Sequence, residues 1–245
     1  MDESDRSPGT SRSGQRPWLE AARQGGILSR LTDAQVESLI RGGQRVNYSA
    51  RSIVPDWDEV PWAAIVLRGC VRAYLPSLEG GQVTLRYLRT GDMMGTFEGI
   101  GPGLARSFQV LEGCELLRLD VGRMTALARK EPAVTWELLQ EAIRVNRQAH
   151  RSFLIRTYGS VRTRVANALL ERANACTAWS EEGAVLNGTQ HELANAAGTV
   201  REVVATALQA LKREGIIQIR RGAIVILDCA RLAEEARSGL GLALQ

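Results

Sequence analysis

The sequence predicts an α+β fold, in which a small antiparallel β barrel or jelly roll is followed by a long helix and a helix-turn-helix with a wing. Three observations predict it. Short alternating apolar runs separated by glycine fill residues 46–120. An apolar stripe with spacings of three and four follows over residues 132–157. Two short helices with capping signals then flank a glycine within residues 189–211.

The length and charge of the chain set wide bounds on its organisation. With 245 residues and a formal charge of +4, the chain is long enough for two domains and is only mildly basic. A nucleic-acid partner is therefore permitted but not required. The predicted units are a disordered tail at 1–17, a jelly roll at 18–130, a dimerisation helix at 131–158 and a DNA-binding domain at 159–245.

Cysteine spacing argues against a metal site. Cys70, Cys114, Cys176 and Cys229 are far apart, form no CxxC pair and have no nearby histidine. Free thiols in a reducing compartment are therefore expected. No apolar run is long enough to cross a bilayer and the N-terminus is polar, so we expect a soluble cytoplasmic protein with no membrane partner.

The N-terminal half contains a short helix and several strand candidates. The helix is expected in LTDAQVESLI, with Thr32 or Asp33 as its cap. Strands are expected in WAAIVLRGCVRAYL on both sides of Arg68-Gly69, in QVTLRYL and in CELLRLD. The apolar residues at period two are Ile65, Leu67, Val71, Ala73, Leu75, Val83, Leu85 and Tyr87. This region has no histidine and no other catalytic grouping, so no enzyme is predicted.

One glycine-rich segment of the barrel suits an anion. In GDMMGTFEGIGPGLARSF, glycine backbone precedes the pair Arg106 and Ser107. Exposed amides, a guanidinium fork and a hydroxyl together match a phosphate group. The alternative is a surface turn with a solvated arginine.

The long helix is expected to begin at Pro132 and end near Thr157. Its stripe has the spacing of a coiled coil, and a second copy of the chain would cover it most simply, which predicts a homodimer. The stripe consists of Trp136, Leu139, Ile143, Asn146, His150, Phe153 and Thr157. His150 is either a structural histidine, a ligand contact or a pH-sensitive group.

The two short helices each begin with a possible capping box. Thr189 lies three residues before Glu192, and Thr199 lies three residues before Glu202. Gly198 between the helices suits the left-handed conformation that ends the first of them.

The second short helix has two distinct faces. The core-facing positions are Val200, Val204, Ala207, Leu208 and Leu211. Arg201, Glu202 and Thr206 lie toward the other face, where a recognition helix meets base edges. An ordinary helical hairpin with a solvated polar face is the alternative. The later segment IIQIRRGAIVIL is expected to form a hairpin whose tip carries Arg220 and Arg221, which suits phosphate contacts.

From about residue 27 to residue 232, the chain resembles the cyclic-AMP receptor protein and fumarate-nitrate regulator family of bacterial transcription factors. The motifs that carry the resemblance are GDMMG with a downstream Arg-Ser, the EP-headed long helix, VRTRVANALL, and TQHELANAAGTVREVVATALQALKREGII followed by a wing. The resemblance implies a cyclic-nucleotide-binding-type jelly roll, a dimerising helix and a winged helix-turn-helix. It also implies double-stranded DNA with a two-fold operator and RNA polymerase as partners.

The resemblance also assigns residues. Arg201 matches a guanine-reading arginine and Glu202 matches a glutamate that accepts from cytosine, which their chemistry permits. Thr206 stands where related proteins have a further base-contacting arginine. The predicted DNA-binding residues are Thr199, Val200, Arg201, Glu202, Thr206, Arg220 and Arg221.

The effector-site residues match the family less closely. Gly95, Arg106 and Ser107 align with its phosphate-binding cassette, whereas Thr96 replaces the ribose-binding glutamate. Ala149 and His150 stand where two polar residues contact adenine. Three interpretations follow: a regulator controlled by an effector such as cyclic AMP or another cyclic nucleotide, a constitutive DNA binder with a degenerate pocket, and an enzyme or cyclic-nucleotide-responsive subunit. The helix-turn-helix favours the first two.

Overall fold

The computed structural model describes residues 17–55, 62–77, 81–95, 106–176, 179 and 183–238. Residues 1–16, within the predicted tail, lie outside this range. The N-terminal elements are α1 (Pro17–Arg23), η1 (Ile27–Arg30), α2 (Asp33–Ile40), β1 (Gln44–Tyr48), β2 (Ile53–Val54), β3 (Ala63–Pro76), β4 (Gln82–Leu88), β5 (Met93–Gly95), β6 (Ser107–Leu119) and α3 (Val121–Lys130). The remaining elements are α4 (Pro132–Tyr158), α5 (Val161–Cys176), β7 (Ala184–Asn187), α6 (Gln190–Ala197), α7 (Arg201–Arg213), β8 (Ile217–Arg220), β9 (Ala223–Ile226) and α8 (Cys229–Glu235).

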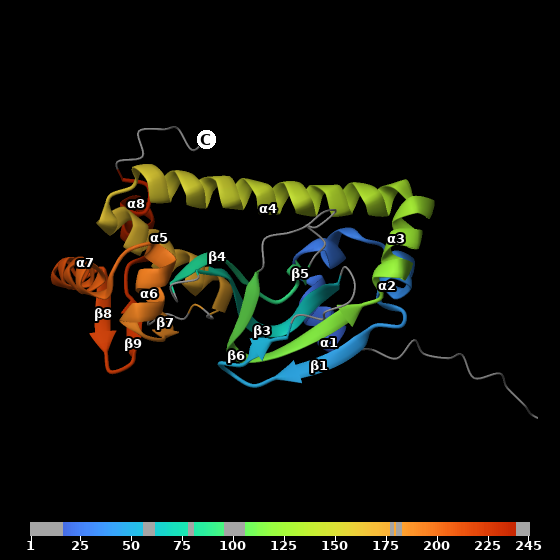
Figure 1. Cartoon of the computed structure of the whole chain (residues 1–245), viewed down its shortest axis with the longest axis horizontal. Helices are drawn as coiled ribbons and strands as arrows, with labels where there is room; N and C mark the ends of the chain where they lie inside the picture. Colours follow the sequence, from blue (N-terminus) through green and yellow to red (C-terminus); the bar gives the residue numbers. More distant parts are fainter. Residues whose placement is uncertain are drawn as a thin grey trace, which may run out of the picture.

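The N-terminal strands form one antiparallel sheet. Its main path is β1-β6-β3-β4, with β2 also paired to β6 and β5 paired to β3. The helix α4 runs along the whole molecule, over the sheet and toward the C-terminal elements (Figure 1). Mixed helix and sheet, with an antiparallel sheet first and a helix-turn-helix later, confirms the predicted α+β class. The helix cap left open by the sequence is Thr32, which forms a capping box with Gln35.

The long strand β3 is a single strand in which Gly69 forms part of a bulge. We expected two runs separated at Arg68-Gly69, but the pairing with β6 continues through this point with shifts of register. Gly69 has a φ of 89°, and a Cβ atom there would lie 2.4 Å from the carbonyl oxygen of Gly113 on β6. Only glycine fits such a close approach, so the bulge depends on it.

The bulge exchanges the two faces of β3. Before it, Ile65 and Leu67 pack in a core with α1, α2, α3 and α4. After it, Val71 and Ala73 pack in a second core between the strands, although all four residues occupy odd positions. The two runs on either side of Arg68-Gly69 therefore face different cores, because an extra residue in a bulge reverses the alternation of side chains.

The strand β4 buries polar residues beside the apolar ones. Thr84 and Arg86 are almost completely buried, whereas Val83 is 42% exposed. Arg72 on β3 is also buried and donates from Nε to the Thr84 hydroxyl over 2.8 Å. These hydrogen bonds, and one of 2.7 Å from Arg86 to the Met93 carbonyl, offset the cost of removing the polar groups from water. Tyr87 is buried and Leu85 is partly buried, so Val83 is the one of the three expected apolar positions that is exposed.

A cluster of charges joins the sheet to α4. Arg144 contacts Asp92 over 3.1 Å and Glu141 over 2.5 Å, and Arg30 of η1 also reaches Glu141. Burial acts to raise the pKa of Glu141, but hydrogen bonds from Arg144 and Arg30 and the charge of Arg86 lower it below its usual value. Glu141 is therefore held as a carboxylate in a nearly dry contact.

The long helix begins and ends close to the predicted positions, with Pro132 in its first turn. Its inner face is formed by Val134, Leu138, Glu141, Ser152 and Ile155. The predicted stripe points away from the rest of the chain: Trp136 is 56% exposed and Phe153 is 65% exposed. No part of the described chain covers this apolar surface.

The C-terminal elements share a core of their own. It contains buried residues of α5, α6, α7, α8 and the three-stranded sheet β7-β9-β8. Val165 and Leu169 of α5 are buried there. Arg162 fixes the outer side of this unit, because it pairs with Glu214 after α7 and with Glu235 of α8.

Two of the cysteines form a disulfide. Cys70 of β3 is bonded to Cys176 at the end of α5, while Cys114 and Cys229 are free. The expectation of four free thiols is wrong. The two bonded residues are 106 positions apart, and only the packing of α5 against β3 brings their Cα atoms to 5.0 Å.

No helix within the described ranges combines the length and the hydropathy needed to cross a membrane.

The bulge makes a matched pair of glycine substitutions informative. Gly69→Ala is expected to lower the free energy of unfolding by about 2 kcal/mol, because a side chain there needs a left-handed backbone and meets a carbonyl oxygen. Gly113→Ala on the partner strand is the control, since its Cβ would meet nothing within 4 Å. Urea denaturation measures both changes. Equal effects of the two substitutions would contradict the role assigned to Gly69.

Candidate nucleic-acid interface

The turn between α6 and α7 is built by two different devices. Thr189 and Glu192 form the predicted capping box at the start of α6, with bonds of 3.2 and 3.3 Å. Gly198 ends α6 in the left-handed conformation, at φ 61° and ψ 48°. The predicted capping box at Thr199 is wrong. Its amide instead donates to the Ala194 carbonyl over 3.0 Å, so this residue belongs to the cap of α6.

The helix α7 therefore begins at Arg201, with Val200 as a cap residue that makes no side-chain bond. Val204, Ala207, Leu208 and Leu211 are buried as predicted. Val200 is not a core residue, since it is 58% exposed at the helix start. The reason is that the cap lies one residue later than expected, at Val200 instead of Thr199, which leaves Val200 outside the buried stripe.

The exposed face of α7 contains the predicted base-reading residues. Arg201, Glu202 and Thr206 are all exposed. The Thr206 hydroxyl donates to the Glu202 carbonyl over 3.2 Å, so its proton is used within the helix while its oxygen can still accept. Within the described part of the chain, the Arg201 guanidinium makes no hydrogen bond or ion pair. Its donors are available to an external acceptor.

The position of this helix depends on an arginine of α5. Arg164 donates from Nη1 to the Gly198 carbonyl over 2.8 Å and so holds the turn that precedes α7. Arg172 performs a similar role at the other end of α6, where it pairs with Glu192 and donates to the Asn187 carbonyl. The sequence pattern gave no indication of either role, because both depend on contacts between residues far apart in the chain.

The wing has the predicted form. Strands β8 and β9 pair antiparallel from Ile217–Ile226 to Arg220–Ala223, and the turn contains Arg221 and Gly222. Arg220 and Arg221 are exposed. Arg220 donates from Nε to Gln218 over 2.9 Å, which leaves its two terminal nitrogens for other acceptors. The wing and the start of α7 together form a surface with arginine at both ends.

The predicted effector residues are only partly described. Gly95 ends β5 opposite Ala63, with a φ of 119° that suits glycine. Arg106 and Ser107 lie at the start of β6, and Ser107 pairs with Tyr74. Thr96 lies outside the described residues. Burial lowers the pKa of Arg106, which lies within electrostatic range of Arg86 at the contact between sheet and α4.

The two α4 positions of the predicted effector site do not join this group. Ala149 and His150 are both exposed in the single chain. No described contact connects either residue to Arg106 or Ser107. The structure therefore keeps Arg106 beside the sheet and places the proposed adenine-contacting positions on the open side of α4.

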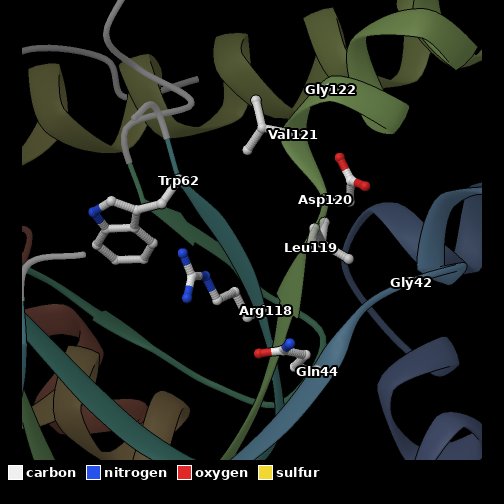
Figure 2. Close-up of a pocket in the computed structure, with 8 residues that line it drawn as sticks. All are labelled: Gly42, Gln44, Trp62, Arg118, Leu119, Asp120, Val121 and Gly122. Carbon is white, nitrogen blue, oxygen red and sulfur yellow. The ribbon is translucent and has the colours of Figure 1, made fainter. Parts of the chain in front are cut away.

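A surface cavity of about 410 Å³ lies elsewhere on the sheet. Figure 2 shows Arg118 extending from β6 toward the Trp62 ring, with Asp120 and Val121 at the start of α3. None of the predicted effector residues that the structure describes lines it. Among the described residues, no group of three or more His, Cys, Asp or Glu side chains is suited to hold a metal ion.

Similarity to known proteins agrees with this architecture. Residues 163–235 match the Crp-like helix-turn-helix domain, which includes α6, α7 and the wing. A crystal structure of a transcriptional regulator of the CRP/FNR family from Thermus thermophilus superposes with a TM-score of 0.68 at 28% identity, covering 80% of this chain and 100% of that one.

Two curated proteins of Thermus thermophilus are also similar. The cyclic AMP receptor protein is 32% identical over 173 residues, which cover 70% of this chain and 78% of that protein. The transcriptional regulator SdrP is 33% identical over 174 residues, which cover 71% and 83%. The chain is thus a DNA-binding transcriptional regulator, not an enzyme, and it belongs to the cyclic-AMP receptor protein and fumarate-nitrate regulator family.

Proposed function

We propose that this regulator binds a two-fold DNA site as a homodimer and reads bases with the start of α7. The observation that carries the proposal is the exposed guanidinium of Arg201 on a helix whose opposite face is fixed in the core. Its fork matches the O6 and N7 acceptors of guanine in the major groove. Glu202 accepts from a cytosine amino group, and Thr206 contacts a third base through its oxygen or its methyl group.

The wing supplies contacts of a different kind. Arg220 and Arg221 at its tip are placed to neutralise phosphates, which adds affinity without base preference. Two copies of α7 related by a two-fold axis would meet major grooves about one helical turn apart, roughly 34–36 Å. A pseudo-palindromic operator is therefore the expected DNA target.

The outer stripe of α4 supports the homodimer. Trp136, Leu139, Ile143 and Phe153 are between 36% and 65% exposed and follow one another along a single face. A parallel copy of α4 would bury this stripe by coiled-coil packing and would place both DNA-binding units at the same end. Apolar surface of this extent in a row is typical of an interface.

The effector is proposed to be an anion such as a cyclic nucleotide, bound near Arg106. One relative is named a cyclic AMP receptor protein, and a mycobacterial relative is named a cAMP-activated global regulator. Arg106 and Ser107 supply phosphate donors at the edge of β6. A constitutive regulator is the second candidate, because Ala149 and His150 offer no described contact on the same side as Arg106.

Base reading predicts different effects for two arginines. Arg201→Ala is expected to weaken binding to a selected operator by about 1–3 kcal/mol, with loss of preference at one base pair. Arg221→Ala is the control, since loss of a phosphate contact weakens selected and random duplexes equally. Fluorescence anisotropy over a range of salt concentrations measures both. If Arg201→Ala also weakens the two duplexes equally, Arg201 does not read a base.

The dimer interface predicts a large effect of one outer residue. Phe153→Ser is expected to weaken self-association by about 2 kcal/mol or more, roughly 30-fold, since each dimer loses the ring twice. Leu227→Ser is the control, because Leu227 is 52% exposed but lies outside α4. Sedimentation equilibrium measures the association constant. An unchanged constant for Phe153→Ser would place the interface elsewhere.

The two candidate effector modes give opposite results with cyclic AMP. If Arg106 binds the phosphate, calorimetry detects binding to the wild-type protein and Arg106→Ala weakens it at least about tenfold, as expected for a lost charge-assisted contact. Operator affinity measured in parallel should rise with the nucleotide. Equal operator affinity with and without cyclic AMP and cyclic GMP would favour the constitutive regulator.

A further inference from the structure

The DNA-binding unit consists of α5, α6, α7, α8 and the sheet β7-β9-β8. It contacts the N-terminal sheet through α5 and α6. In Figure 1 these helices lie between β4 and α7. Arg156 at the end of α4 donates to the Thr84 carbonyl on β4 and, over 3.5 Å, to the Ala196 carbonyl on α6. Tyr87 of β4 is buried in this contact, within electrostatic range of Arg172.

The disulfide is the covalent part of the same contact. Cys70 belongs to the bulged part of β3, where the pairing with β6 shifts on either side of it. Because the bulge reverses the faces of the strand, Cys70 and Arg72 point away from the core that contains Val71. Arg72 lies within electrostatic range of Glu192 and Arg172, so this face is turned toward α5 and α6. Cys70 thereby meets Cys176.

Without this bond, the two units are joined along the chain only where α4 meets α5. Gly159 and Ser160 separate these helices. Each unit has its own buried core, the C-terminal one around α7 and the N-terminal ones around β3. Loss of the bond therefore leaves both units folded and changes only how firmly they are held together.

We propose that Cys70 and Cys176 form a reversible thiol–disulfide site, and that the bonded state holds the DNA-binding unit in the orientation that favours DNA. The proposal rests on the proposed function only where it says that this orientation favours DNA binding. In the bonded structure α7 lies beyond α5 and α6, on the side remote from β4, and Arg201 and Glu202 remain exposed. The bond therefore fixes the reading helix without covering it.

Formation of the disulfide needs an oxidant, and its cleavage needs a reductant. With a peroxide, the Cys176 thiolate takes one oxygen as a sulfenic acid and releases water or an alcohol. The Cys70 thiolate then attacks that sulfur and displaces hydroxide, which leaves as water after gaining a proton. In total, two thiols lose two electrons and two protons to the peroxide.

Reduction by a dithiol begins at the more accessible sulfur. Cys176 is partly exposed and Cys70 is buried. A dithiol thiolate attacks Cys176 Sγ, and Cys70 leaves as a thiolate that takes up a proton. The second thiol of the reagent then closes its own disulfide and releases Cys176.

The other two cysteines do not compete for this chemistry. Burial raises the pKa of the Cys114 thiol to about 12, so almost no reactive thiolate is present at neutral pH. Cys229 is exposed at the start of α8, remote in sequence from either bonded residue. It supplies a control position.

The disulfide changes the affinity for DNA by changing the fraction of time that the DNA-binding unit spends in the orientation that binds DNA. A unit that moves freely about Gly159 occupies the competent orientation for only a fraction of the time, and the apparent dissociation constant rises by the inverse of that fraction. Couplings between sites in proteins are usually about 5- to 150-fold. We therefore expect the bonded and reduced forms to differ in DNA affinity by at least about fivefold.

The experiment compares full-length wild-type protein after treatment with hydrogen peroxide or dithiothreitol. The variants are Cys176→Ser, Cys70→Ala and the control Cys229→Ser. Free thiols are alkylated and located by peptide mass, cleavage near Gly159 by a protease is timed, and affinity is measured for a duplex that the wild-type protein enriches from a random library. The bond is expected to form between Cys70 and Cys176, to slow cleavage and to tighten DNA binding. Cys229→Ser should respond like the wild type.

Four results would overturn the proposal. One is the failure of peroxide to join Cys70 and Cys176, and another is equal or tighter DNA binding by the reduced protein. The third is a redox response that persists in both Cys176→Ser and Cys70→Ala. If no duplex is enriched, the proposed sequence-specific DNA binding fails. The alkylated thiols and the cleavage rates then test, without DNA, whether the disulfide forms reversibly and holds the two units together. Equal cleavage of both redox forms is the fourth result that overturns the proposal.

Discussion

The bulge at Gly69 determines which part of the protein each face of β3 contacts. Before the bulge, β3 packs between the core that it shares with α1, α2, α3 and α4 and the second core between the strands. After the bulge, the face that carries Cys70 and Arg72 turns to the DNA-binding unit. A side chain at Gly69 would collide with Gly113 on β6, so the reversal needs glycine. Because Cys70 follows directly, the same backbone irregularity also places the sulfur that joins the two units.

Arginine side chains make polar contacts that fix how several elements lie against one another. Arg144 joins α4 to Asp92 of the sheet, Arg156 joins α4 to β4 and α6, and Arg164 holds the turn before α7. Such contacts are directional and need little buried area, so they define a geometry without making the units a single core. Polar contacts of Arg156 and one disulfide thus take part in holding the DNA-binding unit against the sheet.

The proposed DNA surface on α7 is separated from the sheet by α5 and α6. Arg201 and Glu202 are free because Val204, Leu208 and Leu211 anchor the other side of α7. Arg106 lies near Arg86 and the charge cluster that holds α4 on the sheet. A ligand at Arg106 would act on α4 through this cluster, whereas the disulfide acts directly on α5. Both would reach α7 through the position of the same unit.

The sequence by itself determined the parts of the protein that depend on neighbouring residues. The α4 stripe, the cap at Thr189, the turn at Gly198, the core side of α7 and the wing follow from periodicity and hydrogen bonds within a few residues.

Only the tertiary structure decided the exchange of faces in β3, the burial of Arg86, the use of Thr199 in the cap of α6 and the pairing of Cys70 with Cys176. The disulfide and the buried polar groups depend on partners elsewhere in the fold, and the faces of β3 depend on a bulge whose position is fixed by contact with β6. Local spacing carries no information about such contacts. The α4 stripe is the intermediate case, since its spacing identified an apolar face and the fold showed that the chain itself leaves that face uncovered.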